Sequence, residues 1–373
     1  MFVEAILFTA LAPLLPDLVE RFDLSKTGAG ALSAAYPLGA LAASFPSIVL
    51  ARRVGLRRTV VVSLLVLAGA SVLLGLATSA ALVFSGRFFQ GVGSAFAYTG
   101  ALSWLTATVS ATRRAEAIGV AFSAAFVGAL LGPLLGAVAD ATGLAPVFLA
   151  TAGFAAALAA LTLMLPAPKP LAADPPPLRR LSADGTVVVS VWLIGLAGAL
   201  LGVFGVLIPL HLDEVGWSAI AIGVLFAFAS VLVALASPFV GRLADRAGRG
   251  TPLRIGLLLA AGTSLGLALE AGAWVYAALS VLAAVAAGIL WGPAMALLAD
   301  AVERRGYDYA AGFGLMNAAW SPGFAVGAGA GAALAALLGD AATYLAVAAT
   351  CVVSAVVATR QEYERPFAPE PVP

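Results

Sequence analysis

The succession of long apolar segments limits what this chain can fold into more than any other feature of its sequence. Twelve such segments lie between Phe2 and Ala358, and short charged or proline-rich breaks separate them. A helix needs about 20 apolar residues to cross a bilayer. Because 62% of the 373 residues are hydrophobic and 10% are charged, twelve spans would occupy most of the chain. We therefore predict an all-α integral membrane protein with twelve transmembrane helices.

Composition also excludes several classes of function. The net charge is +1, so the basic surface that binds nucleic acid is not expected. Cys351 is the single cysteine and His211 the single histidine, which argues against a disulfide and against a thiolate or histidine metal site. The predicted spans lack the paired acids, histidines and nucleophiles that a membrane-embedded enzyme needs. We expect no metal, no cofactor, no nucleic-acid partner and no enzymatic activity.

Basic residues predict the orientation, because they stay on the cytoplasmic side of a membrane. Of the 20 basic residues, 17 fall in breaks on one side, whereas Arg21 and Lys26 lie on the other and Arg87 lies within a span. Both termini are therefore predicted to be cytoplasmic. The first segment begins without basic residues, so we expect a retained span and not a cleaved signal peptide. The excess of Arg over Lys indicates a bacterial protein of the cell membrane.

The longest polar stretch divides the chain into two halves. It carries six prolines between Pro166 and Pro177, so it reads as an extended cytoplasmic linker and not as a helix. We predict one six-helix bundle over residues 1–165, the linker over 166–186, a second bundle over 187–360, and a cytoplasmic tail over 361–373.

The two halves resemble each other at an offset of 193 residues. Ser25 then meets Ser218, Gly30 meets Gly223, and the segment 50–55 meets 243–248. Two related six-span bundles with a site between them form a transporter architecture, in which the bundles rock about that site.

A charged loop between the eighth and ninth segments carries the first family resemblance. It reads Gly241-Arg-Leu-Ala-Asp245-Arg246-Ala-Gly248-Arg249, which resembles the cytoplasmic loop signature G-x-L-x-D-R-x-G-R of the major facilitator superfamily. The resemblance implies that Asp245 lies near the start of the fifth span, around residues 115–116, where helix-end amides favour an acid. It also implies a gating role for this loop.

The equivalent loop of the first half departs from the signature. Arg52 stands where the acid would be, followed by Arg53, so the usual latch is not expected there. We expect Arg52 to pair instead with Asp300, Glu303 or Asp308.

The fourth segment contains Arg87-Phe-Phe-Gln90-Gly91-Val-Gly93. This is similar to the R-x-x-x-G-x-G motif, which is typical of proton-coupled members of the superfamily. An arginine inside a bilayer is costly unless it is paired or hydrated, so Arg87 and Gln90 are predicted site residues. The alternative is that Arg87 extends to the outer surface while its alkyl stem stays in lipid.

The fifth segment contains Gly128, Gly132, Pro133 and Gly136. These residues resemble the g-x-x-x-G-P-x-x-G motif of the antiporters, chiefly drug/proton exporters. Glycines at every fourth position clear one helix face for close packing, and the proline permits a bend. Ordinary small-residue packing is the alternative interpretation.

The first segment carries Glu4 and ends with Pro13 and Pro16, which resembles the first span of the same antiporter group. Either Glu4 takes part in proton coupling or substrate recognition, or it lies at the cytoplasmic surface. Helical rise puts Glu4 about 18 Å and Arg87 about 12 Å from the outer surface. We therefore predict that the two side chains bridge and are coupled.

Four further residues are candidates for the wall of a central cavity: Tyr98, Trp192, Trp291 and Asn317. The resemblance implies that the first, fourth, seventh and tenth spans line this cavity, which makes Trp192 and Trp291 candidate wall residues; Asn317 lies in the eleventh segment. His211 is interpreted as a solvated residue at the outer surface.

The function predicted from these features is proton-coupled export of small lipophilic compounds by alternating access. The partners would be a small-molecule substrate, protons and the lipid bilayer, and we expect a monomer. A sugar or metabolite facilitator or exporter of the same superfamily is the alternative.

Overall fold

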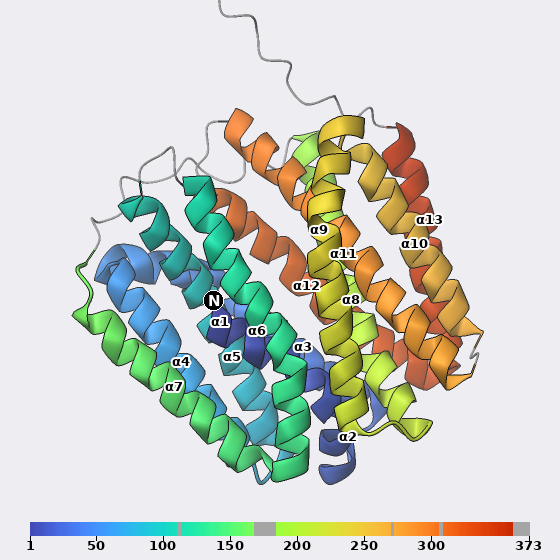
Figure 1. Cartoon of the computed structure of the whole chain (residues 1–373), viewed down its shortest axis with the longest axis horizontal. Helices are drawn as coiled ribbons and strands as arrows, with labels where there is room; N and C mark the ends of the chain where they lie inside the picture. The colour runs from blue at the N-terminus through green and yellow to red at the C-terminus, as the bar shows by residue number, and fades with distance from the viewer. Residues whose placement is uncertain (110–113, 168–183, 270–271, 306–308, 361–373) are drawn as a thin grey trace, which may run out of the picture.

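The computed structural model describes residues 1–109, 114–167, 184–269, 272–305 and 309–360, and this part of the chain is helical without strands. Figure 1 shows the arrangement of the helices. The predicted linker and tail fall mostly outside the described residues. The thirteen helices are α1 (Phe2–Thr9), α2 (Leu11–Arg21), α3 (Lys26–Val54), α4 (Leu56–Gly75), α5 (Ala80–Thr108), α6 (Arg114–Thr142), α7 (Leu144–Met164), α8 (Gly185–Glu214), α9 (Ala219–Ala247), α10 (Gly250–Ala268), α11 (Ala273–Arg304), α12 (Tyr309–Leu338) and α13 (Asp340–Arg360).

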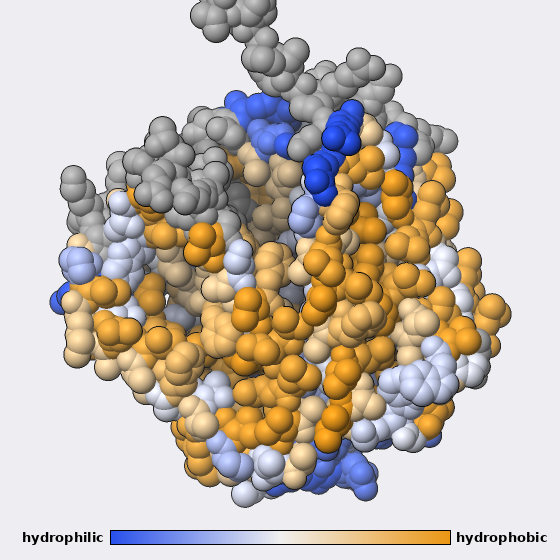
Figure 2. All heavy atoms as spheres, in the orientation of Figure 1, coloured by the Kyte–Doolittle hydropathy of each residue, from blue (hydrophilic) through white to orange (hydrophobic). Residues whose placement is uncertain are grey.

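By length and apolar composition, the described helices account for eleven of the predicted twelve spans. Ten of them are long and apolar enough to cross a membrane, and α1 with α2 forms one further span that is bent by 46°. The remaining helix, α5, coincides with the predicted fourth span but is not among the helices that are apolar enough by this measure. Figure 2 shows a broad apolar belt, with hydrophilic residues gathered at its two ends. The all-α membrane fold is therefore confirmed.

Pro13 explains the break between α1 and α2. Proline lacks an N–H, and its ring would clash with the carbonyl of the residue four positions earlier, which is Thr9. The helix accordingly stops at Thr9 and resumes at Leu11. The Thr9 hydroxyl donates to the carbonyl of Ala5 at 3.0 Å and also faces the carbonyl of Ala129 at 3.1 Å. These contacts fix the end of α1 against α6.

The repeat predicted from the sequence appears in the helix caps. Ser25 and Ser218 cap α3 and α9, each by accepting a hydrogen bond from the backbone N–H three residues later, at 3.1 and 3.3 Å. Gly55 and Gly248 end the same two helices with φ of 87° and 78°, a conformation that favours glycine. Equivalent residues at the offset of 193 thus begin and end α3 and α9.

The two halves of the chain pack together through equivalent helix pairs. Gly30 of α3 lies against α12, where an added Cβ would come within 2.5 Å of the Ala332 side chain. Gly223, the equivalent residue of α9, lies against α6, where a Cβ would come within 2.8 Å of the Pro133 carbonyl oxygen. Small residues allow this close approach in membranes. The α3–α12 and α6–α9 contacts are therefore related by the repeat.

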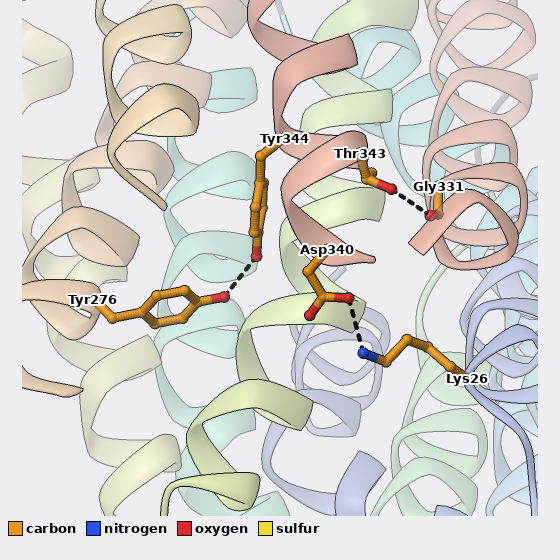
Figure 3. A network of polar contacts seen from close by, with 6 residues as sticks. All are labelled: Lys26, Tyr276, Gly331, Asp340, Thr343 and Tyr344. Atoms are coloured by element: carbon orange, nitrogen blue, oxygen red, sulfur yellow. Dashed lines mark hydrogen bonds and ion pairs between the residues drawn. The ribbon is translucent and has the colours of Figure 1, made fainter. Parts of the chain in front are cut away.

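An ion pair joins the halves at the predicted outer end. Lys26 at the start of α3 lies 2.8 Å from Asp340 at the start of α13, as Figure 3 shows. At the predicted cytoplasmic end, the polar contacts of Arg57, Arg249 and Arg305 each stay within one half. The face in Figure 2 is hollowed between the halves towards this end. The ion pair between Lys26 and Asp340 therefore links the two halves at the predicted outer end, whereas these three arginines bind within their own halves.

Candidate functional site

Glu4 is buried inside the first half, with 5% of its surface exposed. Its Oε1 accepts hydrogen bonds from the Tyr36 hydroxyl of α3 and from the Ser94 hydroxyl of α5, the latter at 3.0 Å. Its Oε2 is also buried and has no hydrogen-bond partner among the described residues. The interpretation of Glu4 as a cytoplasmic surface residue is therefore wrong.

Arg87 is buried as well, with 3% of its surface exposed. Its Nη1 donates to the Leu7 carbonyl at 3.0 Å and to Gln90 Oε1 at 2.8 Å. Because these partners lie inside the half, Arg87 does not extend to the outer surface. The Leu7 contact ties α5 to α1, the helix that carries Glu4, and Gln90 serves as the partner of the guanidinium.

Glu4 and Arg87 do not form the direct bridge that helical depth suggested. Tyr36 lies between them: its hydroxyl contacts Glu4, and the Arg87 guanidinium carbon lies 5.0 Å from the centre of its ring. Such a cation–π contact is attractive, most of all in a desolvated position. Sequence analysis does not single out Tyr36. The one feature of the sequence that could have indicated Tyr36 is its position inside an apolar segment, where a buried hydroxyl needs a hydrogen-bond partner.

The glycines of the Arg87 motif explain why these groups meet. A Cβ on Gly91 would overlap the carbonyl oxygen of Tyr36, so α5 packs against α3 at this turn with no room for a side chain. A Cβ on Gly93 would lie 2.7 Å from the Leu67 side chain of α4. The two glycines therefore bring α5 close to two neighbours, and the Gly91 contact fixes the backbone of Tyr36 beside Arg87 and Gln90.

The predicted glycine face of α6 packs against α1 and the start of α2. A Cβ on Gly128 or Gly132 would come within 2.5 Å of the carbonyl oxygens of Phe2 or Ile6, and one on Gly136 would overlap that of Ala10. The expectation of close packing is confirmed. Since Pro133 on another face meets α9, α6 connects the helix of Glu4 with the second half.

An aromatic cluster lies beside Glu4 and spans both halves. Phe8, one turn after Glu4, has its ring centre 4.8 Å from that of Tyr36 and 5.5 Å from those of Trp320 and Phe324 on α12. Phe8 thus joins the helix of Glu4 to α12 of the second half. An apolar aromatic residue in an apolar segment carries no functional signal, so sequence analysis does not identify Phe8 or Phe324.

The four cavity candidates occupy different surroundings. Tyr98 is half-buried, packs against Phe122 and interacts electrostatically with Glu4. Trp192 is 53% exposed, and its indole N–H donates to the Ser354 hydroxyl of α13 at 3.1 Å, so it does not belong to the Glu4 cluster. Trp291 and Asn317 are half-buried on α11 and α12.

The cytoplasmic signature is described in part. Arg249 donates to the Ala296 carbonyl at 2.6 Å and pairs with Asp300, both on α11. Gly248 is buried, whereas Gly241, Arg246, Arg52 and Arg53 are exposed. The side chains of residues 115, 116, 245, 303 and 308 lie outside what the structure describes. The expected partners of Asp245 and Arg52 therefore stay predictions.

Known proteins resemble this chain both in family and in fold. The family model of the Major Facilitator Superfamily matches residues 1–306 and 191–372. No curated protein matches.

Three solved structures illustrate the likeness in fold. One is a bacterial homolog to the human lysosomal transporter Spinster, inward-facing and occupied (TM-score 0.79, 16% identity, covering 99% of this chain and 96% of that chain). The others are a POT family transporter in complex with 5-aminolevulinic acid (0.76, 14%, 96% and 94%) and a D-xylose-proton symporter (0.76, 16%, 97% and 96%).

Proposed function

Because the chain belongs to the Major Facilitator Superfamily, we propose that it is a proton-coupled secondary transporter that exports small lipophilic compounds. The observation that carries the proposal is the buried carboxylate of Glu4, which keeps one oxygen without a partner among the described residues. An ionisable group inside a membrane span is costly, so it marks a functional site by default. A carboxylate that gains and loses a proton is the simplest device for coupling transport to a proton gradient.

Alternating access would work through the contacts between the halves. The Lys26–Asp340 ion pair and the Phe8 cluster close the outer side, so substrate would enter the site from the cytoplasmic side. Reversing a two-state equilibrium from 1:99 to 99:1 needs a differential binding free energy of about 5.5 kcal/mol. Neutralising a buried carboxylate changes the free energy of a closed site by several kcal/mol, which is of this order.

Export of lipophilic compounds is supported by two features. The glycine–proline face of α6, which resembles the antiporter motif, connects the helix of Glu4 with α9. The aromatic residues Phe8, Trp320 and Phe324 offer an apolar surface beside Glu4. We place the protein in the bacterial cell membrane with both termini cytoplasmic, because the basic residues concentrate at that end.

A sugar or metabolite transporter of the same superfamily is the second candidate. The observation that favours it is a set of buried polar atoms without hydrogen-bond partners among the described residues: Gln90 Nε2 and the hydroxyls of Ser33 and Ser321. Such groups would recognise a substrate that carries several hydroxyls.

Transport by the purified protein in liposomes tests the proposal. We expect an imposed pH gradient to drive accumulation of a lipophilic fluorescent dye, and Glu4→Gln to abolish this while leaving dye exchange without a gradient partly intact. Glu214→Gln, at an exposed acid of α8, is the matched control and should transport normally. A Glu4→Gln protein that still concentrates dye would show that Glu4 is not the coupling acid. Gradient-driven uptake of sugars but not of dyes would favour the second candidate.

A further inference from the structure

Tyr36 touches both buried charged residues of the site. It is 1% exposed, its hydroxyl contacts Glu4 Oε1, and its ring lies under the Arg87 guanidinium. An ionised carboxylate only accepts hydrogen bonds, so the phenol is the donor in this contact. The Nη1 of Arg87 instead donates hydrogen bonds to the Leu7 carbonyl and to Gln90 Oε1. The positions of Arg87 and Glu4 are therefore linked through Tyr36.

The surroundings leave Tyr36 little freedom to move. Its backbone carbonyl lies against Gly91 of α5, and one turn later Gly39 of α3 packs against the backbone of Phe88. Its ring also packs against Phe8, at 4.8 Å between ring centres. A tyrosine held at backbone and ring presents its hydroxyl at a fixed point, which is what a positioning residue must do.

The two oxygens of Glu4 consequently differ. Oε1 accepts hydrogen bonds from Tyr36 and Ser94, whereas Oε2 has no partner in the described part of the chain. A proton on Oε1 would disrupt the hydrogen bonds from Tyr36 and Ser94, whereas Oε2 accepts no hydrogen bond within 3.5 Å from the described residues; the Tyr98 hydroxyl is a further donor that faces the carboxylate. The proton would come from water that reaches the site, and it would return to water on the other side of the membrane.

We propose that Tyr36 is the positioning residue of the proton site, holding Oε1 of Glu4 so that Oε2 is the atom that binds and releases the proton. This inference rests on the proposed role of Glu4 in proton coupling. In this arrangement Tyr36 links Arg87 to the carboxylate of Glu4, because the two charged groups form no direct ion pair.

The charged and titratable groups around Glu4 come from several elements. α3 contributes Tyr36, α5 contributes Arg87 and Tyr98, and the amino group of Met1 lies on the same segment as Glu4. The described part of α6 that faces α1 includes Gly128, Gly132 and the carbonyl of Ala129. Tyr36→Phe removes the hydroxyl that contacts Glu4 but keeps the ring that lies under Arg87.

The pH dependence of gradient-driven transport tests this role. Tyr36→Phe keeps the ring under Arg87 but removes the donor to the ionised carboxylate, so Glu4 should bind its proton at a higher pH. We expect the pH of half-maximal transport to rise by about one unit, as expected for the loss of a hydrogen bond to a charged group. Tyr344→Phe is the matched control: this buried tyrosine bonds the Tyr276 hydroxyl at 2.6 Å in the second half, and its loss should leave the midpoint unchanged.

The outcomes separate this inference from the proposed function. If Glu4→Gln abolishes gradient-driven transport but Tyr36→Phe has the wild-type pH midpoint, the positioning role is overturned and the role of Glu4 stands. If Glu4→Gln still concentrates substrate, the proposed function itself fails. Should Tyr36→Phe not fold, Ser94→Ala removes the second donor to Oε1 and must raise the midpoint too; an unchanged midpoint would overturn the inference.

Discussion

At the level of single residues, the guanidinium of Arg87 makes a set of contacts that a lysine ammonium could not reproduce. It donates to Leu7 and Gln90 from one nitrogen and lies over the ring of Tyr36, whereas the lysine ammonium is a point charge on a flexible stem. Losing a hydrogen bond of a charged group costs about 1.5–3 kcal/mol, so Arg87→Lys should slow gradient-driven transport by roughly 10- to 100-fold in a folded protein. Arg57→Lys is the control, since Arg57 also donates to two carbonyls but is half-buried and lies outside the Glu4 site. Equal rates in both variants would contradict the role of Arg87. Initial rates of dye uptake per folded protein provide the measurement.

At the scale of elements, the glycine face of α6 sets how closely the helix of Glu4 can approach. A side chain on Gly132 would meet the Ile6 carbonyl and the Thr9 hydroxyl, and overpacking costs about 1–3 kcal/mol. Gly132→Leu should therefore reduce transport by roughly ten-fold or more while the protein still reaches the membrane. Gly153→Leu, on α7 where an added side chain meets nothing within 4 Å, should transport normally. The measurement is the initial rate of dye transport, divided by the amount of folded protein determined by fluorescence-detected gel filtration. Normal transport by Gly132→Leu would show that transport does not require the close contact between α1 and α6.

At the scale of the whole molecule, the ion pair between Lys26 and Asp340 is the described polar link between the halves at the outer end. Tyr276 and Tyr344 share a hydrogen bond nearby, and Thr343 donates to the Gly331 carbonyl, so the start of α13 is firmly held (Figure 3). A partly exposed ion pair contributes about 0.2–1 kcal/mol. Lys26→Ala should therefore increase the outward-open population up to about five-fold, whereas Lys26→Arg should not. Distances between spin labels on the outer ends of α3 and α13 report this population, and an unchanged distribution for Lys26→Ala would show that the pair does not hold the outer side closed.

Features that depend on local chemistry can be predicted from the order of residues alone. Helices in lipid satisfy their backbone hydrogen bonds within each segment, so apolar length was enough to predict the spans. Ser25, Gly55 and their equivalents Ser218 and Gly248 act as caps within one turn of the chain, which is why the repeat was visible before the fold was known. The cost of a charge inside a bilayer likewise marks Arg87 as a candidate, and the resemblance of the first segment to an antiporter span marks Glu4.

Which side chains contact one another depends on how the helices pack in three dimensions. In a membrane, lipid and neighbouring helices are both apolar, so the hydrophobic pattern does not show which face of a span turns inwards. Helical rise gave the depths of Glu4 and Arg87 but not their directions around the helix axis, and Tyr36 occupies the space between them. For the same reason, the contacts of Phe8 with α12 and the position of Trp192 beside α13 could not be predicted from the sequence. The direction of a side chain follows from how the helices pack and not from the order of residues within each helix.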